Sequence, residues 1–239
     1  MKVNWNYIKA FALLVLVVFL YSFSSARNKR RNLERIEVHF TNDENLYITE
    51  TAVNKLLIQK HDSVQNLAKE TLDLKVIENR LDTDEMIEDA EVYLTVNGRL
   101  EAVISQRRPI ARVYGNESYY IDVNGKHMPL STNYSARVPF IKSIEEEHIP
   151  EVYPLVMKID KDEFLKEHIT LIKRNQKGEY VLEMRLYDFE ILFGEANSIE
   201  NKIKNLKAFY KKALLDNQLG TYKWVNLKFE NQVVCTKKG

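Results

Sequence analysis

The sequence is poor in cysteine, glycine and proline. Its 239 residues include one cysteine, seven glycines and five prolines. The single Cys235 excludes an intrachain disulfide, although a protein exported from the cytoplasm does not need one. The low glycine and proline content argues against a low-complexity or disordered chain. The thirteen tyrosines and ten phenylalanines suit half-buried β-sheet.

The sequence also lacks an excess of charge of either sign. The chain has 35 lysines and arginines against 34 aspartates and glutamates, for a formal net charge of +1. No overall field would attract nucleic acid, so we expect no nucleic-acid partner. The one basic run, residues 27–31, follows an apolar segment, where such a run typically contacts lipid headgroups.

The common active-site motifs are absent from the sequence, which has no glycine-rich phosphate loop, HExxH or GxSxG. The densest polar cluster, residues 145–148, has adjacent carboxylates that point in different directions and no second histidine at ligand spacing. This favours a solvated acidic segment over a metal site. Cys235 lies in an apolar run that is typical of a small buried hydrophobe. We therefore expect no enzyme, no cofactor and no small-molecule substrate; a membrane-anchored enzyme using residues 145–148 is the alternative.

One long apolar run is present, at residues 10–23. With its flanks, 8–26, it approaches the ~20 residues that a helix needs to span ~30 Å of hydrocarbon. It has no polar face, which a core helix of a soluble domain would show. We predict a transmembrane helix over 8–26, with the lipid bilayer as its partner. A short tail, 1–7, precedes it and a basic stalk, 27–33, follows it.

Two questions about this segment have competing answers. Ser24 and Ala26 form a small-x-small site, which is typical of a cleaved signal peptide, but the basic run 27–31 is a poor context for cleavage. The positive-inside rule, taken literally, would place the body in the cytoplasm. A short N-terminal tail before a large domain is instead typical of an exported signal-anchor protein. Charge alone therefore leaves the orientation open.

After the basic stalk, the rest of the sequence divides into two predicted regions. Residues 34–107 predict two helices on one face of a small sheet, and residues 108–239 predict a larger, mostly antiparallel β domain with a C-terminal helix and edge strands. The fold class is thus α+β. The elements expected in the first region are, in order, a strand at 36–40, a helix capped by Thr49, a helix capped by Asp73, and strands at 91–96 and 99–104. Those expected in the second are strands at 110–114, 118–123, 126–130 and 138–141, a helix around 153–164, strands at 169–173, 180–187 and 189–193, a helix from 198 to near Gly220, and closing strands at 222–229 and 233–235.

Local signals complete this picture. Asn97–Gly98 and Asn124–Gly125 each predict a type I′ hairpin turn. Ser198 is a predicted side-chain cap for the last helix, and Gly220 lies where that helix is expected to end. Arg107 to Pro109 could bind an anion or mark a strand edge that stops at proline.

Several motifs resemble a known family. The order strand–helix–helix–strand–strand next to a membrane anchor resembles the polypeptide-transport-associated (POTRA) domain. Residues 106–113, QRRPIARV, resemble the RxPxAxV junction of FtsQ/DivIB cell-division proteins, and residues 119–125, YYIDVNG, resemble their YxID-x-x-G strand-turn. Further pieces at 128–131, 138–139 and 222–234 also match. The resemblance covers essentially the whole chain, with no firm family pattern over 145–168.

The resemblance implies a non-enzymatic divisome scaffold of the cell inner membrane, with a cytoplasmic N-terminus and a periplasmic body. Residues 34–107 would be the POTRA domain and 108–239 the FtsQ-type β domain. Such a protein recruits and bridges cell-division proteins during septum formation, and holds the FtsB–FtsL pair by β-strand addition at its C-terminal strands. The alternative is another POTRA-bearing envelope protein that handles unfolded polypeptides for insertion or secretion.

The resemblance places the partner-binding segment near the C-terminus. Residues 224–229 alternate, so we expect a strand with one row of side chains packed on the domain. A strand so late in the sequence is expected at a sheet edge, with N–H and C=O groups open to strand addition. Phe229 would be an apolar anchor, although alternation alone also allows Phe229 and Val233 to be core. The predicted partner-binding residues are Trp224, Asn226, Lys228, Phe229, Glu230, Asn231, Gln232 and Val233.

Overall fold

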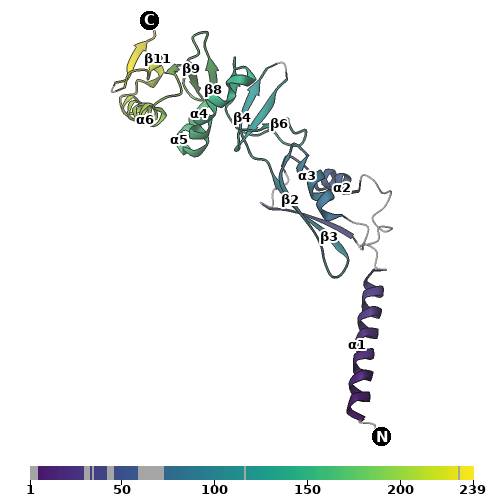
Figure 1. The fold of residues 1–239 in the computed structure, drawn as a ribbon. Helices are drawn as coiled ribbons and strands as arrows, with labels where there is room; N and C mark the ends of the chain where they lie inside the picture. Colours follow the sequence, from purple (N-terminus) through teal and green to yellow (C-terminus); the bar gives the residue numbers. More distant parts are fainter. Residues whose placement is uncertain are drawn as a thin grey trace. The chain divides into compact units, whose positions relative to one another are not determined.

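The computed structural model describes residues 5–29, 33, 35–41, 46–58, 73–115, 117–230 and 232–239. The chain forms two compact units, residues 1–106 and 107–239, which are described separately below (Figure 1). Together they give the predicted α+β fold, with an N-terminal apolar helix, a small helix-backed sheet and a larger sheet.

The N-terminal helix α1 (Trp5–Lys29) has 25 residues. Its segment Ile8–Ser25 has a mean hydropathy of 2.0, and none of that segment is buried within the protein. At ~1.5 Å per residue, the helix is long enough to cross the ~30 Å hydrocarbon core of a bilayer. Among the described residues it is the one helix long and apolar enough to do so. An unburied apolar surface of this length fits the predicted transmembrane helix.

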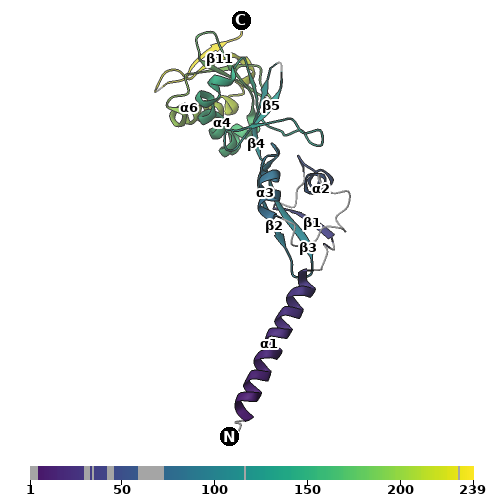
Figure 2. The same ribbon diagram turned by 45° about the vertical axis from the view of Figure 1, so that its right-hand side comes forward.

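The rest of the first unit is a three-stranded sheet with two helices (Figure 2). Its strands are β1 (Arg35–Phe40), β2 (Ile87–Leu94) and β3 (Arg99–Gln106), and its helices are α2 (Glu50–Ile58) and α3 (Leu74–Asp82). Strand β3 is central, parallel to β1 and antiparallel to β2. Alternate residues of β3 point at the helices, so that Leu100, Ala102 and Ile104 share one core with Val53 and Leu81. The predicted order of elements is confirmed.

Both helices of this unit begin at the predicted caps. Thr49 Oγ1 accepts a hydrogen bond from the Ala52 N–H at 3.2 Å. Asp73 Oδ1 accepts one from the Val76 N–H, also at 3.2 Å. Each side chain satisfies a backbone donor that the first helical turn leaves unpaired.

The turns at Asn97–Gly98 and Asn124–Gly125 differ from the type I′ prediction, and a third turn, Asn175–Gly178, has the same form as they do. A type I′ turn needs positive φ at both central residues, whereas only the glycines have positive φ in the turns Thr95–Gly98, Asp122–Gly125 and Asn175–Gly178 (92°, 76° and 79°). In each turn the glycine N–H donates to the carbonyl of the first residue, at 3.0, 2.9 and 3.0 Å. The side chain of that first residue also accepts N–H groups of the turn or the returning strand. Each turn therefore spans four residues and is held by the side chain of its first residue.

The second unit contains a nine-stranded sheet. Its strands are β4 (Pro109–Tyr114), β5 (Tyr119–Asp122), β6 (His127–Met128), β7 (Phe140–Lys142), β8 (Ile169–Arg174), β9 (Tyr180–Met184), β10 (Glu190–Gly194), β11 (Tyr222–Asn226) and β12 (Val234–Lys237). Their order across the sheet is β12-β11-β10-β9-β8-β7-β4-β5-β6. Five neighbouring pairs are antiparallel and three are parallel, so the sheet is mostly antiparallel as predicted.

Helices pack on one face of this sheet. They are η3 (Glu146–His148), α4 (Ile149–Lys161), α5 (Glu163–His168), α6 (Ile199–Leu215) and the short η4 (Leu219–Thr221). Leu155 of α4, Leu165 of α5 and Leu206 of α6 share one core with sheet residues such as Ile172 and Val225. The predicted helical connection is confirmed, as two helices rather than one. Asp162 separates them and caps α5, because its side chain accepts from the Leu165 N–H at 3.2 Å.

Helix α6 begins and ends differently from the prediction. Ser198 stands at the N-cap, but its backbone is left-handed (φ 47°) and its side chain makes no capping hydrogen bond. At the other end Asn217 takes the left-handed conformation (φ 55°), and the Gln218 N–H donates to the Ala213 carbonyl at 2.8 Å. Asparagine adopts this conformation more readily than most residues other than glycine, and the helix ends here, before the expected Gly220.

Two arginines at the start of the second unit pair with aspartates. Arg107 Nη1 lies 2.7 Å from Asp122 Oδ2, and the Asp122 side chain is fully buried. Arg108 makes two hydrogen bonds to Asp160, at 2.9 and 2.8 Å. Both arginines therefore bind carboxylates of their own unit, and Pro109 begins a strand.

The Asp160 pair makes the stability of this unit sensitive to acid. The Arg108 hydrogen bonds, with a further one from Lys166, lower the pKa of the Asp160 carboxyl below its ordinary value. Because the folded-state pKa is the lower one, the pair stabilises the fold fully above the unfolded pKa, and that stabilisation is lost as pH falls through the folded pKa.

We expect Asp160→Asn to lower the free energy of unfolding at pH 7 by about 1 kcal/mol. Between pH 7 and a pH below the ordinary aspartate pKa of about 4, the variant should lose less stability than the parent protein. Urea unfolding at both pH values measures this. The same loss on acidification in parent and variant would contradict the assigned role of Asp160.

Candidate protein-binding edge

The outermost strand at one end of the large sheet is β12. Strand β11 lies between β10, to which it is parallel, and β12, to which it is antiparallel. The expectation that the strand at 224–229 forms the sheet edge is therefore wrong. Both sides of that strand are covered by strands of the same chain, and the last strand in the sequence takes the edge (Figure 1).

The backbone of β12 alternates between its neighbour and the outside. The Lys238 N–H donates to the Thr221 carbonyl at 2.8 Å, so position 238 faces the β11 side. Backbone groups of a strand point to its two sides in turn, which places Thr236 on the same side. Cys235 and Lys237 then direct their N–H and C=O groups outward. Within the described part of the chain, no strand pairs with that outer side.

Trp224 and Asn226 lie in β11, on the face opposite the buried Val225. The Trp224 side chain is 37% exposed, and Lys223 Nζ lies 4.4 Å from its ring centroid. Asn226 ends the strand because its Oδ1 accepts a hydrogen bond from the Lys228 N–H at 3.0 Å. Local side-chain bonding of this kind competes with strand pairing, which explains why the strand is shorter than predicted.

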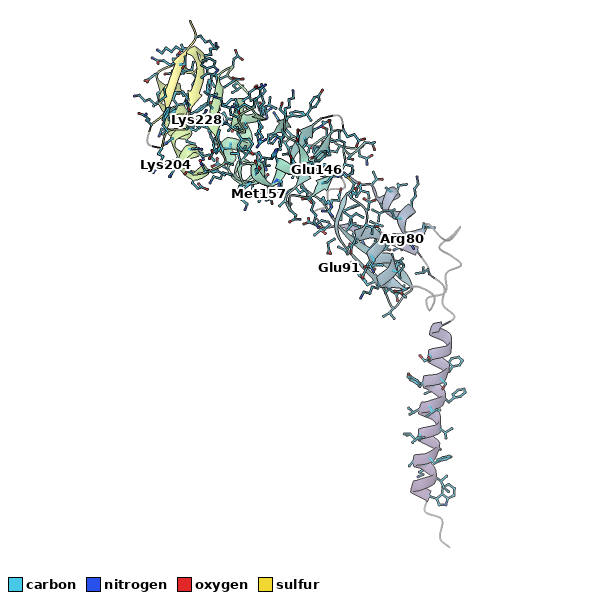
Figure 3. The ribbon with its side chains drawn as sticks, turned by 45° about the horizontal axis from the view of Figure 1, so that its top comes forward. Arg80, Glu91, Glu146, Met157, Lys204 and Lys228 are labelled. Carbon is cyan, nitrogen blue, oxygen red and sulfur yellow. The ribbon has the colours of Figure 1, made fainter. Side chains whose placement is uncertain are left out.

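Lys228, labelled in Figure 3, is held on the domain by contacts of its side chain. Its Nζ donates to both carboxylate oxygens of Glu179 at 2.7 Å, and this contact lowers the pKa of the Glu179 carboxyl. The stem of Lys228 packs so closely on Gly194 that a Cβ there would lie 3.1 Å from Lys228 Cγ. In contrast, Phe229 is 45% exposed and is not part of the core.

The remaining predicted residues surround the start of β12. The Glu230 carbonyl accepts a hydrogen bond from Asn205 Nδ2 of α6 at 3.1 Å. Asn231 lies outside the described residues. Val233 is partly buried and packs against the core, whereas Gln232 is exposed. Both line a hollow of about 410 Å³ between α6 and β12, together with Phe209, Lys212 and Cys235.

Comparison with protein families decides which family this is. A family model for FtsQ/DivIB, C-terminal related, matches residues 108–236. The chain belongs to the FtsQ/DivIB family. A model for a POTRA-like domain matches residues 34–105, which cover the three-stranded sheet except for the last residue of β3. No curated protein matches the chain. This FtsQ/DivIB protein therefore has a cell-division role, in a family of non-enzymatic scaffolds, and the family match favours that role over polypeptide insertion or secretion.

The edge of this FtsQ/DivIB protein lies in a basic part of the chain. Between Ile199 and Gly239 the sequence has nine lysines and three acidic residues, although the whole chain is nearly neutral. Lys237 ends the edge strand β12, Lys238 follows it, and Lys212 borders the hollow beside it. A lysine-rich edge favours a partner segment that carries negative charge.

The sequence analysis predicted a closing strand at 233–235, but its predicted binding residues include neither β12 nor the α6 side of the hollow. The lysine excess after Ile199 was a usable signal for this region, but it does not show which strand lies outermost. The cluster Glu145, Glu147 and His148, considered above for a metal, brings its ligand atoms within 4.8 Å at the start of α4. Its two glutamates are exposed, and nothing else in the described residues points to an ion. Burial raises the pKa of the Cys235 thiol, which opposes a nucleophilic role.

Proposed function

We propose that this FtsQ/DivIB protein recruits and bridges cell-division proteins by accepting a partner strand at β12. The partner would be an FtsB–FtsL-like pair of membrane proteins, captured during septum formation. One observation carries the proposal. The last strand of the large sheet has an outer side with which no described strand pairs, and N–H and C=O groups of Cys235 and Lys237 point to that side.

Strand addition uses these groups directly. An extended segment beside β12 would continue the sheet, and its side chains would alternate between the two faces. One row would point toward the hollow between α6 and β12, which Val233 and Gln232 border. The exposed Phe229 lies in the loop before β12 and could pack on the partner as an apolar anchor. In this proposal Lys228 positions that loop through Glu179 instead of contacting the partner.

The membrane anchor sets where this capture takes place. We place α1 in the cell inner membrane, with the N-terminus in the cytoplasm and both soluble units in the periplasm. The 25-residue apolar helix and the FtsQ/DivIB family support this placement. A reporter enzyme that is active only in the periplasm, fused after Gly239, tests the orientation.

Site-specific cross-linking tests the proposed edge. A photo-reactive amino acid at Lys237 of the full chain should cross-link the FtsB-like partner in dividing cells, because residue 237 lies at the outer side of β12. The matched control is the same group at Lys177, which is exposed at the tip of the turn between β8 and β9. If the partner carries negative charge, the purified complex should also weaken as salt is raised. Equal cross-linking from both positions, or from Lys177 alone, would contradict the proposal.

A further inference from the structure

The small sheet of the first unit has an outer strand of its own. In the order β1-β3-β2, strand β2 pairs with β3 on one side, and no described strand lies on its other side. The Thr95 N–H donates to the Arg99 carbonyl at 2.9 Å, so position 95 faces β3. By alternation, Tyr93 faces β3 as well, while Val92 and Leu94 direct their backbone groups to the outer side. An outer strand of this kind is a ready template for another chain.

The outer N–H of Val92 is already in use. It donates to Glu78 Oε1 at 3.0 Å, and Glu78 belongs to helix α3, which packs beside β2 (Figure 2). The carboxylate oxygen thus takes the hydrogen bond that the carbonyl of an incoming strand would accept. The helix is fixed at its start by the Asp73 cap and in its middle by the buried Ile77, so Glu78 is presented from a well-anchored element.

The negative charge along this edge also opposes strand addition. Glu88, Asp89 and Glu91 of β2 are exposed (Glu91 is labelled in Figure 3). Charged side chains along an outer strand are a recognised protection against pairing with another chain.

We propose that Glu78 closes the outer side of β2 against strand addition, so that this POTRA-like unit does not accept an extended polypeptide there. The carboxylate is an autoinhibitory contact built into the fold. It occupies the Val92 donor and places negative charge where an added strand would bring its carbonyl oxygens. This inference concerns the first unit alone and does not depend on the proposed role of β12.

The test uses the full chain in detergent micelles and a fluorescent peptide with the sequence of β3, Arg99–Gln106, which already pairs with β2 in the fold. We expect Glu78→Ala to bind the peptide at least tenfold more tightly than the parent protein. Glu78→Lys, which cannot accept a hydrogen bond, should behave in the same way. Glu78→Gln keeps an acceptor oxygen for the Val92 N–H but loses the negative charge, so it should bind more tightly than the parent and less tightly than Glu78→Ala. Glu85→Ala removes a nearby exposed acid and is the matched control.

Amide hydrogen exchange supplies a second readout that does not need the peptide. The Val92 amide should exchange at least tenfold faster in Glu78→Ala than in the parent or in Glu78→Gln, while the Ala102 amide of the central strand keeps its protection. Equal peptide binding by the parent, Glu78→Ala and Glu78→Lys would overturn the proposal. An unchanged Val92 exchange rate in Glu78→Ala would overturn it as well.

Discussion

Replacing Lys237 by proline should weaken capture of the proposed FtsB-like partner at least tenfold while the second unit stays folded. Proline has no N–H, and in a sheet it is tolerated where the missing donor faces away from the neighbouring strand. At position 237 that donor points to the outer side of β12, so the pairing with β11 is kept. An acceptor left unpaired in the complex costs about 1–3 kcal/mol, and each 1.4 kcal/mol is tenfold in affinity.

The matched control is Lys237→Ala, which removes the same charge and keeps the N–H. Titration of the purified partner against each full-length variant, followed by a change in fluorescence anisotropy, compares their dissociation constants. Alanine should bind within a few-fold of the parent, and proline at least tenfold more weakly. A second proline variant, Lys238→Pro, removes a donor that the chain itself uses, since the Lys238 N–H donates to the Thr221 carbonyl. It should lower stability, which separates the effect of an outward donor from that of proline itself.

Should Lys237→Pro bind as tightly as Lys237→Ala, the backbone of β12 is not the binding element. The exposed Phe229 and the hollow beside α6 would then be the remaining candidates near the C-terminus. Substitution of Phe229 alone would distinguish a side-chain contact from strand addition, because it leaves every backbone group of β12 in place.

The order of elements could be predicted because it depends on local signals. Apolar alternation marks β3, and the caps Thr49 and Asp73 lie next to the helices that they start. The long apolar run likewise gives α1 without any tertiary information. These features need only the nearest few residues, which a single sequence contains.

The position of the edge could not be predicted in the same way. Alternation over 224–229 suits a central strand as well as an outer one, and only its pairing with both β10 and β12 shows that it is covered. Its early end depends on the Asn226 side chain, and the immobilised Lys228 depends on Glu179, 49 positions earlier in the chain. The Glu78 contact to Val92 is invisible in the sequence for the same reason. Which groups stay unpaired is decided by contacts between distant segments.

Asp122 shows what the family motif at 119–125 does physically. Its side chain is fully buried at the end of β5, where Oδ2 lies 2.7 Å from Arg107 Nη1. Its Oδ1 accepts the Asn124 and Lys126 N–H groups at 2.9 and 2.7 Å and so shapes the turn that ends at Gly125. One carboxylate therefore joins the first residue of the second unit to the turn between β5 and β6.

We expect Asp122→Ala to lower the free energy of unfolding of the second unit by about 3–5 kcal/mol, because it leaves the Arg107 charge nearly buried without a partner and removes the turn acceptor. Asp122→Asn keeps an oxygen for the turn and should cost less. Arg107→Ala and the double variant complete a cycle that isolates the ion pair. Denaturant unfolding of the full chain in micelles, followed by the fluorescence of Trp224 in a Trp5→Phe background, measures each value. Losses that simply add in the double variant would show that Arg107 and Asp122 do not act on each other, and the motif would then owe its stabilising effect to the turn alone.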